Sequence, residues 1–148
     1  MNLCDIDQIK ALLARHGFRF SKSMGQNFLI QPWVPRDIAC SSGAGSGKGV
    51  LEIGPGIGPL TRELSLLADQ VVSVELDRSL LPILTETLGD RDNVEIVSGD
   101  ILKLDIPSLV RERFQGLEPI ACANLPYNIT TPAITALLDA GCFSSITI

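Results

Sequence analysis

The sequence predicts an α/β fold, in which a mostly parallel β-sheet carries helices on both faces. Short runs of β-branched and aliphatic residues, such as residues 71–74, alternate with stretches that carry leucine or isoleucine at helical spacing. Strands that alternate with helices need crossover connections, which make neighbouring strands parallel and cover the sheet with helices. The 148 residues are enough for one such domain and too few for two.

The expected elements follow one another without a visible sequence repeat. Strands are predicted at 50–53, 71–74, 94–97 and 120–123, and a fifth strand begins within 143–148. Helices are predicted at 5–16, 33–41, 79–88, 107–114 and 131–140, with one more after residue 58 that places Leu60, Leu64 and Leu67 on one face. The glycine- and serine-rich stretch 41–49 is expected to be an exposed connection. Because the last residues stop inside an apolar, β-prone run, we expect a piece of a longer protein, truncated after the start of its fifth strand.

Composition excludes several classes of protein. Hydrophobic residues make up 45% of the chain, which argues against disorder, and no apolar run approaches the roughly 18–20 residues of a membrane span. The N-terminus lacks the apolar core of a secretory signal. The four cysteines form no C-x-x-C pair, so we expect neither a metal site nor a disulfide framework. We expect the cysteines to be small, buried, apolar side chains of a protein in the reducing cytoplasm. The single histidine, His16, is expected to interact with the C-terminus of a helix.

Polar or glycine residues recur where the predicted strands end. Gly54, Glu75, Asp100 and Asn124 each follow one of four successive strands. Because ligands of open α/β sheets bind at the carboxyl ends of the strands, these residues are expected to line one edge. Glycines in the loop 54–58 let the backbone turn tightly and approach a ligand, although the spacing G-x-G-x-G is weak evidence alone.

Two of the residues at the strand ends, Glu75 and Asp100, are acidic, and each suits a bound nucleoside. Glu75 is placed to accept hydrogen bonds from both ribose hydroxyls of an adenosine, while Asp77 is expected to be a solvated charge beyond the strand. Asp100 can accept a hydrogen bond from an exocyclic adenine amine, and it can equally cap a following helix. A further acidic residue, Glu52, lies two positions before the first glycine.

The most specific motif is Asn124-Leu125-Pro126-Tyr127. The carboxamide oxygen of Asn124 and a neighbouring backbone carbonyl can accept two N–H bonds from a planar amino group, and Tyr127 offers a face for stacking on a base. The alternative is a tight turn with a surface tyrosine. We favour the functional interpretation because three other strand ends also suit a nucleoside.

Together these segments resemble class I S-adenosylmethionine-dependent methyltransferases with a Rossmann-like fold. More narrowly, they resemble the KsgA/RsmA family of ribosomal RNA adenine N6,N6-dimethyltransferases. The resemblance lies in residues 18–29, 50–58, 74–77, 99–101 and 124–129, which occur in the family's order. It implies an N-terminal helical arm and cofactor-covering loop at 1–49, an incomplete S-adenosylmethionine-binding core at 50–148, and a C-terminal helical domain that this sequence does not include.

The resemblance also implies the site and the partners. The cofactor S-adenosylmethionine would contact Gln26, Asn27, Leu29, Gly54, Gly56, Glu75, Leu76, Asp100, Ile101 and Asn124. The catalytic residues would be Asn124, Leu125, Pro126 and Tyr127. The implied partner is small-subunit ribosomal RNA or a pre-ribosomal particle in the cytoplasm, with no membrane and no metal. A net charge of −5 is unusual for an RNA-binding protein. Basic residues nevertheless concentrate near the N-terminus, at Lys10, Arg15, Arg19, Lys22 and Arg36.

Other functions remain open at this point. An antibiotic-resistance methyltransferase that acts on large-subunit ribosomal RNA shares most of the motifs. A noncatalytic RNA-binding assembly or transcription factor would keep the fold without methyl transfer, although the intact 124–127 motif disfavours it. A dinucleotide dehydrogenase is disfavoured by the glycine spacing. The stretch 41–49 imitates a phosphate-binding P-loop, but it precedes a strand instead of following one, which excludes ATP binding there.

Overall fold

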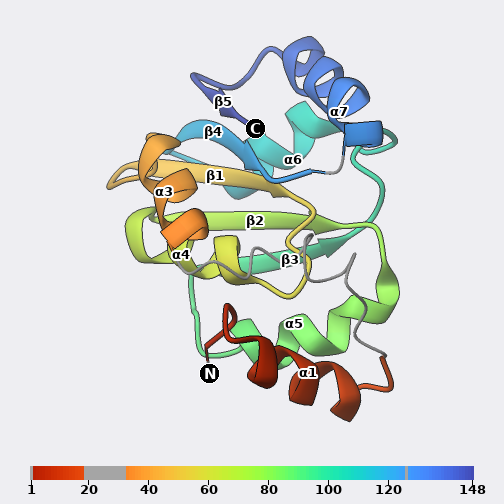
Figure 1. Cartoon of the computed structure of the whole chain (residues 1–148). Coiled ribbons are helices and arrows are strands. Elements are labelled where there is room, and N and C mark those ends of the chain that lie inside the picture. Colours follow the sequence, from red (N-terminus) through yellow and green to blue (C-terminus); the bar gives the residue numbers. More distant parts are fainter. Residues whose placement is uncertain (1, 19–32, 126) are drawn as a thin grey trace.

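A parallel sheet is the centre of the molecule (Figure 1). The computed structural model describes residues 2–18, 33–125 and 127–148, and of Tyr127–Ile129 it describes only the backbone. Within these residues one five-stranded sheet has the order β3-β2-β1-β4-β5, and every neighbouring pair is parallel. The strands are β1 Lys48–Ile53, β2 Gln70–Glu75, β3 Val94–Ser98, β4 Glu118–Ala123 and β5 Ile146–Thr147. The predicted α/β class is therefore confirmed.

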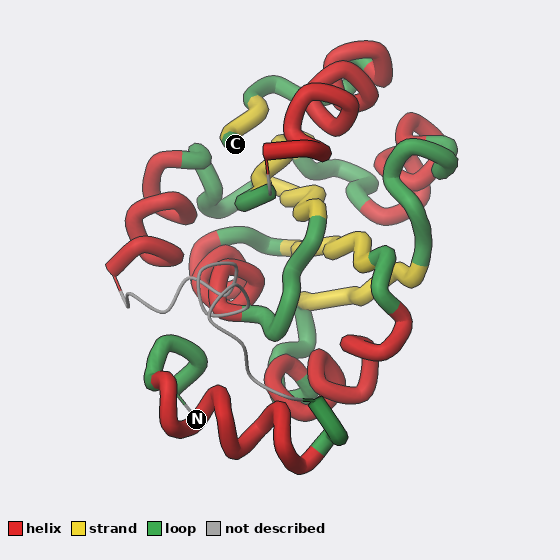
Figure 2. The backbone as a smooth tube through the Cα atoms, turned by 45° about the vertical axis from the view of Figure 1, so that its right-hand side comes forward, coloured by secondary structure: helices red, strands yellow, loops and turns green. Residues whose placement is uncertain are grey.

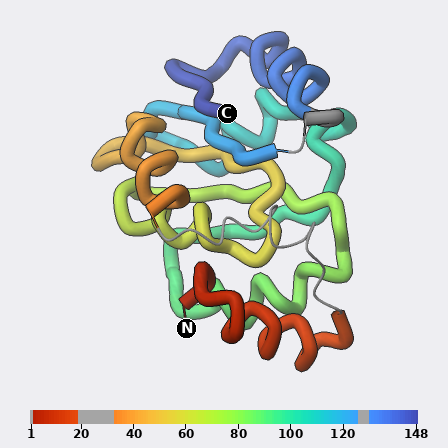
Figure 3. Tube along the Cα trace, viewed as in Figure 1, coloured from red at the N-terminus to blue at the C-terminus, as the bar shows by residue number. Residues whose placement is uncertain are grey.

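Among the described residues, two helices precede the first strand and the others lie in the connections between successive strands; Figure 3 follows the chain through them. They are α1 Ile6–Arg15, α3 Trp33–Ser41, α4 Pro59–Leu67, the short 3-10 helix η1 Arg78–Leu80, α5 Leu81–Leu88, α6 Ile106–Arg113 and α7 Tyr127–Ala140. Capping explains where two of them begin: the side chains of Asp5 and Asp105 accept backbone N–H groups in the first turns of α1 and α6. No helix in the described part of the chain is long and apolar enough to span a membrane.

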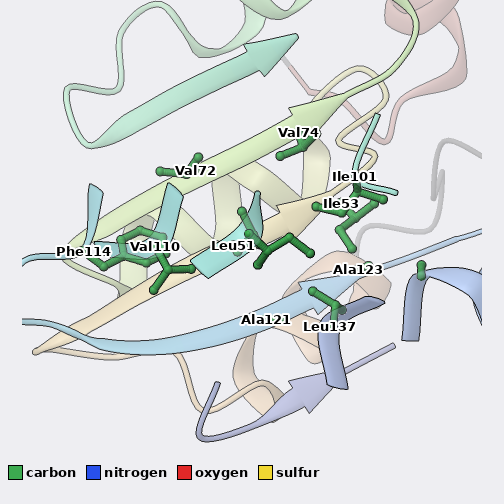
Figure 4. Packing of buried hydrophobic residues seen from close by; sticks show 12 residues of the cluster. Leu51, Ile53, Val72, Val74, Ile101, Val110, Phe114, Ala121, Ala123 and Leu137 are labelled. Atoms are coloured by element: carbon green, nitrogen blue, oxygen red, sulfur yellow. The ribbon is translucent and has the colours of Figure 1, made fainter. Parts of the chain in front are cut away.

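The alternation of side chains along each strand divides the core between the two faces of the sheet. On one face, Leu51, Val72 and Ala121 pack under α6 and α7, which contribute Val110 and Leu137 (Figure 4). On the other face a second cluster packs under α3 and α4. It contains Val50, Val71, Ile120, Cys122, Ala39, Leu60 and Leu64. Helices therefore cover both faces, as predicted.

A third cluster joins the N-terminal helix to the rest of the molecule. Leu12 and Leu13 of α1 pack with Ile83 of α5 and with Ile57, which lies in the glycine-rich loop. At the edge of this cluster, the carboxylate of Glu86 pairs with His16 and Arg15. Both views of the backbone place α1 beside α5 (Figures 1 and 2). The helix α1 is thus packed on the core.

The structure corrects several predicted boundaries. Residues 41–49 are not a wholly exposed connection, because Ser42 is buried and β1 already begins at Lys48, which pairs with Glu118 of β4. The last helix begins at Tyr127 and not at residue 131, so Pro132 lies inside it and gives up one N–H hydrogen bond. The fifth strand is only Ile146–Thr147.

Some predicted burial is also wrong. Leu67, predicted to share one face of the helix with Leu60 and Leu64, is 38% exposed, whereas those two leucines are buried. Of the four cysteines, only Cys122 is buried, on β4; Cys40 is exposed near the end of α3, and Cys4 and Cys142 are half-buried. Only Cys122 therefore acts as a small core residue.

Gly49 makes a close approach that allows a direct test of the packing. A Cβ at this position would lie 2.4 Å from Cδ1 of Phe114, which is buried on the same face. We expect Gly49→Ala to lower the free energy of unfolding by about 1–3 kcal/mol, because the ring has to move inside a packed core. Urea denaturation measures the change. Gly45→Ala is the control, since nothing lies within 4 Å of a Cβ there, and equal stability of the two variants would contradict the packing.

Candidate functional site

The register of the strands brings four predicted residues to one edge of the sheet. Ile53 is paired with Val74 on one side and with Ala123 on the other. The amide of Gly54 donates to the carbonyl of Val74 at 2.9 Å, and the amide of Gly99 donates to the carbonyl of Glu75 at 3.0 Å.

It follows that Asp100, Glu75, Gly54 and Asn124 succeed one another across the carboxyl edge, each at the end of the next strand. Neighbouring strands lie about 4.8 Å apart, so this row spans about 14 Å. That length suits an extended nucleoside.

The loop after β1 runs along this edge with a backbone that needs glycine. Gly54, Gly56 and Gly58 have φ angles of 70°, 61° and 103°, which side chains other than glycine adopt only with strain. A Cβ on Gly54 would also lie 3.4 Å from Leu125, the residue after Asn124. The loop and the 124–125 segment are therefore in direct contact.

Glu75 is held in place by two backbone amides. Its Oε1 accepts a hydrogen bond from the amide of Gly56 at 3.2 Å, and its Oε2 accepts one from the amide of Asp77 at 2.9 Å. Burial raises the pKa of Glu75, although both hydrogen bonds act to lower it. Each carboxylate oxygen has a second lone pair with which to accept a hydroxyl group. Beside it, the side chain of Leu76 is 67% exposed and offers an apolar surface.

Asp100 turns the chain at the end of β3. Its side chain accepts from the amide of Leu102 at 2.9 Å, and its carbonyl accepts from the amide of Lys103. The alternative role of helix cap is wrong for this residue, because α6 begins only at Ile106 and has Asp105 as its cap. The side chain of Ile101 is buried in the cluster under α6 and α7. Asp77, predicted to be a solvated charge, is exposed and caps η1 through Ser79.

A buried carboxyl group directly under the loop received no role from the sequence. Glu52 of β1 is 1% exposed and accepts hydrogen bonds from the hydroxyls of Ser73 on β2, at 2.6 Å, and of Thr61 on α4. Burial raises its pKa to about 7, against the effect of these two hydrogen bonds. The group thus links three elements at the place where the glycine-rich loop begins. Its position two residues before the first glycine is the only local signal for it.

Some predicted site residues are outside the described part of the chain. These are Gln26, Asn27, Leu29 and Pro126, together with the side chain of Tyr127. The structure brings together the other predicted site residues, which are Gly54, Gly56, Glu75, Leu76, Asp100, Ile101, Asn124 and Leu125.

Comparison with known proteins identifies the family. The family described as ribosomal RNA adenine dimethylase matches residues 17–148. The chain belongs to the ribosomal RNA adenine dimethylase family. Over 130 residues it is 46% identical to ribosomal RNA small subunit methyltransferase A of Clostridioides difficile (strain 630), covering 88% of this chain and 45% of that protein. The chain therefore spans less than half the length of this relative.

Solved structures agree with this assignment. The 23S rRNA methyltransferase ErmE is 33% identical with a TM-score of 0.66, over 78% of this chain and 45% of that one. A dimethyladenosine transferase from Plasmodium falciparum is 28% identical with a TM-score of 0.58, over 74% of this chain and 37% of that one. The predicted Rossmann-like fold of class I methyltransferases is confirmed.

The buried carboxyl group of Glu52 predicts a pH dependence of stability. Its pKa is 4.5 when the chain is unfolded and about 7 when folded. As the pH rises from 4.5 to 7, the unfolded chain loses this proton first, so stability falls with pH, by about 3 kcal/mol in total. In Glu52→Gln we expect a much flatter pH dependence in this range, measured by urea denaturation at pH 5 and pH 8.

The control is Glu112→Gln, which makes the same change of charge on the exposed surface of α6. The control is expected to keep the wild-type pH dependence. An unchanged pH dependence in Glu52→Gln would show that the buried carboxyl group titrates normally.

Proposed function

We propose that the chain is the catalytic part of an enzyme that dimethylates adenines of small-subunit ribosomal RNA at N6 during ribosome biogenesis, with S-adenosylmethionine as methyl donor. The observation that carries the proposal is the row formed by Asp100, Glu75, Gly54 and Asn124 along one edge of the sheet. Membership of the ribosomal RNA adenine dimethylase family supports the same reaction.

The residues of the edge fit the chemistry of the proposed cofactor. An adenosine offers hydroxyl and amino donors, and the edge offers carboxylate acceptors from Glu75 and Asp100, each already oriented by backbone amides. Leu76 offers an apolar surface for the base, and the glycine-rich loop allows close backbone approach. We assign Gln26, Asn27 and Leu29 to the same site. When bound, S-adenosylmethionine supplies a methyl group that its sulfonium already activates.

The proposed role of the 124–127 motif is to position and polarise the target adenine. The lone pair of an adenine amino group is delocalised into the ring, so the amine is a poor nucleophile. Acceptance of its two N–H bonds by Asn124 and by a backbone carbonyl of Leu125 or Pro126 favours a tetrahedral nitrogen and stabilises its growing positive charge. Tyr127 stacks on the base, and the released proton goes to water. A second cycle gives the dimethylated base.

The proposed enzyme has three parts. The segment 1–49 forms the N-terminal arm and the loop over the cofactor, 50–148 forms the cofactor-binding core, and a helical C-terminal domain follows in the longer protein. The partner is small-subunit ribosomal RNA or a pre-ribosomal particle, which places the enzyme in the cytoplasm. Neither a metal ion nor a membrane takes part in the proposed reaction.

The second candidate is methylation of large-subunit ribosomal RNA. It is favoured by the likeness to the 23S rRNA methyltransferase ErmE at 33% identity. The 46% identity to a small subunit methyltransferase A favours the first candidate. Transfer of labelled methyl groups to small-subunit particles, compared with naked large-subunit RNA, separates the two.

Asn124 provides the sharpest test of the proposed reaction. In the protein that includes the C-terminal domain, we expect Asn124→Ala to reduce methyl transfer by about 100-fold or more, because a preorganised acceptor at the reacting nitrogen is lost. Cofactor affinity, measured by calorimetry, should fall only modestly. Asn2→Ala, in the exposed N-terminal turn, is the control. Near-normal turnover of Asn124→Ala would refute the role.

A further inference from the structure

A hydrogen bond from a distant helix holds the middle of the glycine-rich loop. The hydroxyl of Thr87, in the last turn of α5, donates to the carbonyl of Ile57 at 2.8 Å. Thr87 is 5% exposed, so the bond is sheltered from water. The same peptide unit is held at its other end, because the amide of Gly58 donates to the carbonyl of Pro55 at 2.9 Å. The peptide between Ile57 and Gly58 therefore has one orientation.

Packing around the loop fixes it in the same place. The side chain of Ile57 is fully buried among Leu12, Leu13 and Ile83, and so points away from the sheet edge into the cluster of α1 and α5. At Gly58, a Cβ would lie 3.1 Å from the Thr87 hydroxyl and 3.2 Å from Leu88. The side chains of Thr87 and Leu88 on α5 thus pack directly on the loop backbone at Gly58, which has no side chain of its own.

The held peptide is next to the amide that contacts Glu75. Gly56 precedes Ile57, and its amide donates to Oε1 of Glu75 at 3.2 Å. A change in the orientation of the loop at Ile57 would move this amide and release one side of the carboxylate. Thr87 is thus connected to Glu75 in three steps: its hydrogen bond to Ile57, the peptide bond from Ile57 to Gly56, and the hydrogen bond from Gly56 to Glu75. Thr87 itself has no position at the edge.

We propose that Thr87 is a positioning residue of the cofactor site, which sets the conformation of the loop 54–58 and, through the amide of Gly56, the carboxylate of Glu75. The proposal rests on the proposed function, in which Glu75 binds the ribose of S-adenosylmethionine. Thr87 acts through the loop and makes no contact with the cofactor. Its hydroxyl is needed for cofactor affinity more than for the stability of the fold.

The chain offers a matched control two residues away. Thr87→Val removes the hydroxyl and keeps the shape of the side chain, while Thr87→Ser keeps the hydroxyl. Thr85 is on the same helix, and its hydroxyl donates to the carbonyl of Leu81 within that helix at 3.0 Å. Thr85→Val therefore removes a hydroxyl–carbonyl bond from the exposed side of α5 without touching the loop.

The first measurement is amide hydrogen exchange in the cofactor-free protein. We expect Thr87→Val to speed exchange at Gly56 and Gly58 by about 10-fold, in line with the loss of one buried hydrogen bond. Thr85→Val and Thr87→Ser should stay within about twofold of the wild type at these amides. Unchanged exchange in Thr87→Val would overturn the proposal, and this readout does not require the cofactor to bind.

The second measurement is the affinity for S-adenosylhomocysteine by calorimetry, in the wild type, in the threonine variants and in a Glu75→Ala background. We expect Thr87→Val to weaken binding about 5- to 20-fold, and by less than about twofold when Glu75 is already alanine. Equal effects in both backgrounds would mean that Thr87 does not act through Glu75. Failure of the wild type to bind would instead refute the proposed function, and exchange would still decide the role of Thr87 in the loop.

Discussion

Parallel pairing of β2, β1 and β4 determines where the loops after these strands begin. Because the backbone hydrogen bonds of a parallel ladder run from one strand to the next, Ile53 aligns with Val74 and with Ala123, and the residues that follow must leave the sheet side by side. Gly54, Glu75 and Asn124 inherit their places at the edge from this register, and Asp100 inherits its place from the parallel pairing of β2 with β3. A shift of one residue in any strand would exchange the two faces and bury the wrong side chains.

The face of the sheet under α3 and α4 combines apolar packing with polar links near the glycine-rich loop. Glu52 joins β1, β2 and α4 there, and Thr87 reaches the loop from α5 on its other side. A buried carboxyl group is unfavourable unless it is hydrogen-bonded, and here two hydroxyls donate to it. Glu52 thus anchors the strand just before the loop and Thr87 anchors the middle of the loop, and neither side chain is assigned to the cofactor site. This is consistent with a site that relies on preorganisation.

Much of this arrangement can be predicted from the sequence. The features that cannot be predicted all depend on how the folded chain pairs or turns. The alternation of strands with helices predicts the α/β fold class. The spacing of Gly54, Glu75, Asp100 and Asn124 predicts that they lie along one edge of the sheet. Both predictions succeed because they depend on local patterns. The start of β1 at Lys48 depends on its pairing with Glu118, which no local pattern reveals. Asp105, and not Asp100, caps α6, because the side chain of Asp100 is used in a turn in which it accepts from the amide of Leu102. The bond from Thr87 to Ile57 joins residues 30 positions apart, so only the folded chain shows it.

The shared cluster of α1, α5 and Ile57 has a consequence for the order of events during synthesis. A ribosome makes α1 first, but its partners Ile57 and Ile83 emerge only after many further residues have been added. Until then the apolar face formed by Ile9, Leu12 and Leu13 stays in contact with water or with a chaperone. The nascent chain must therefore keep α1 unburied while β1 and β2 are made, and the glycine-rich loop gains its final support only when α5 has emerged.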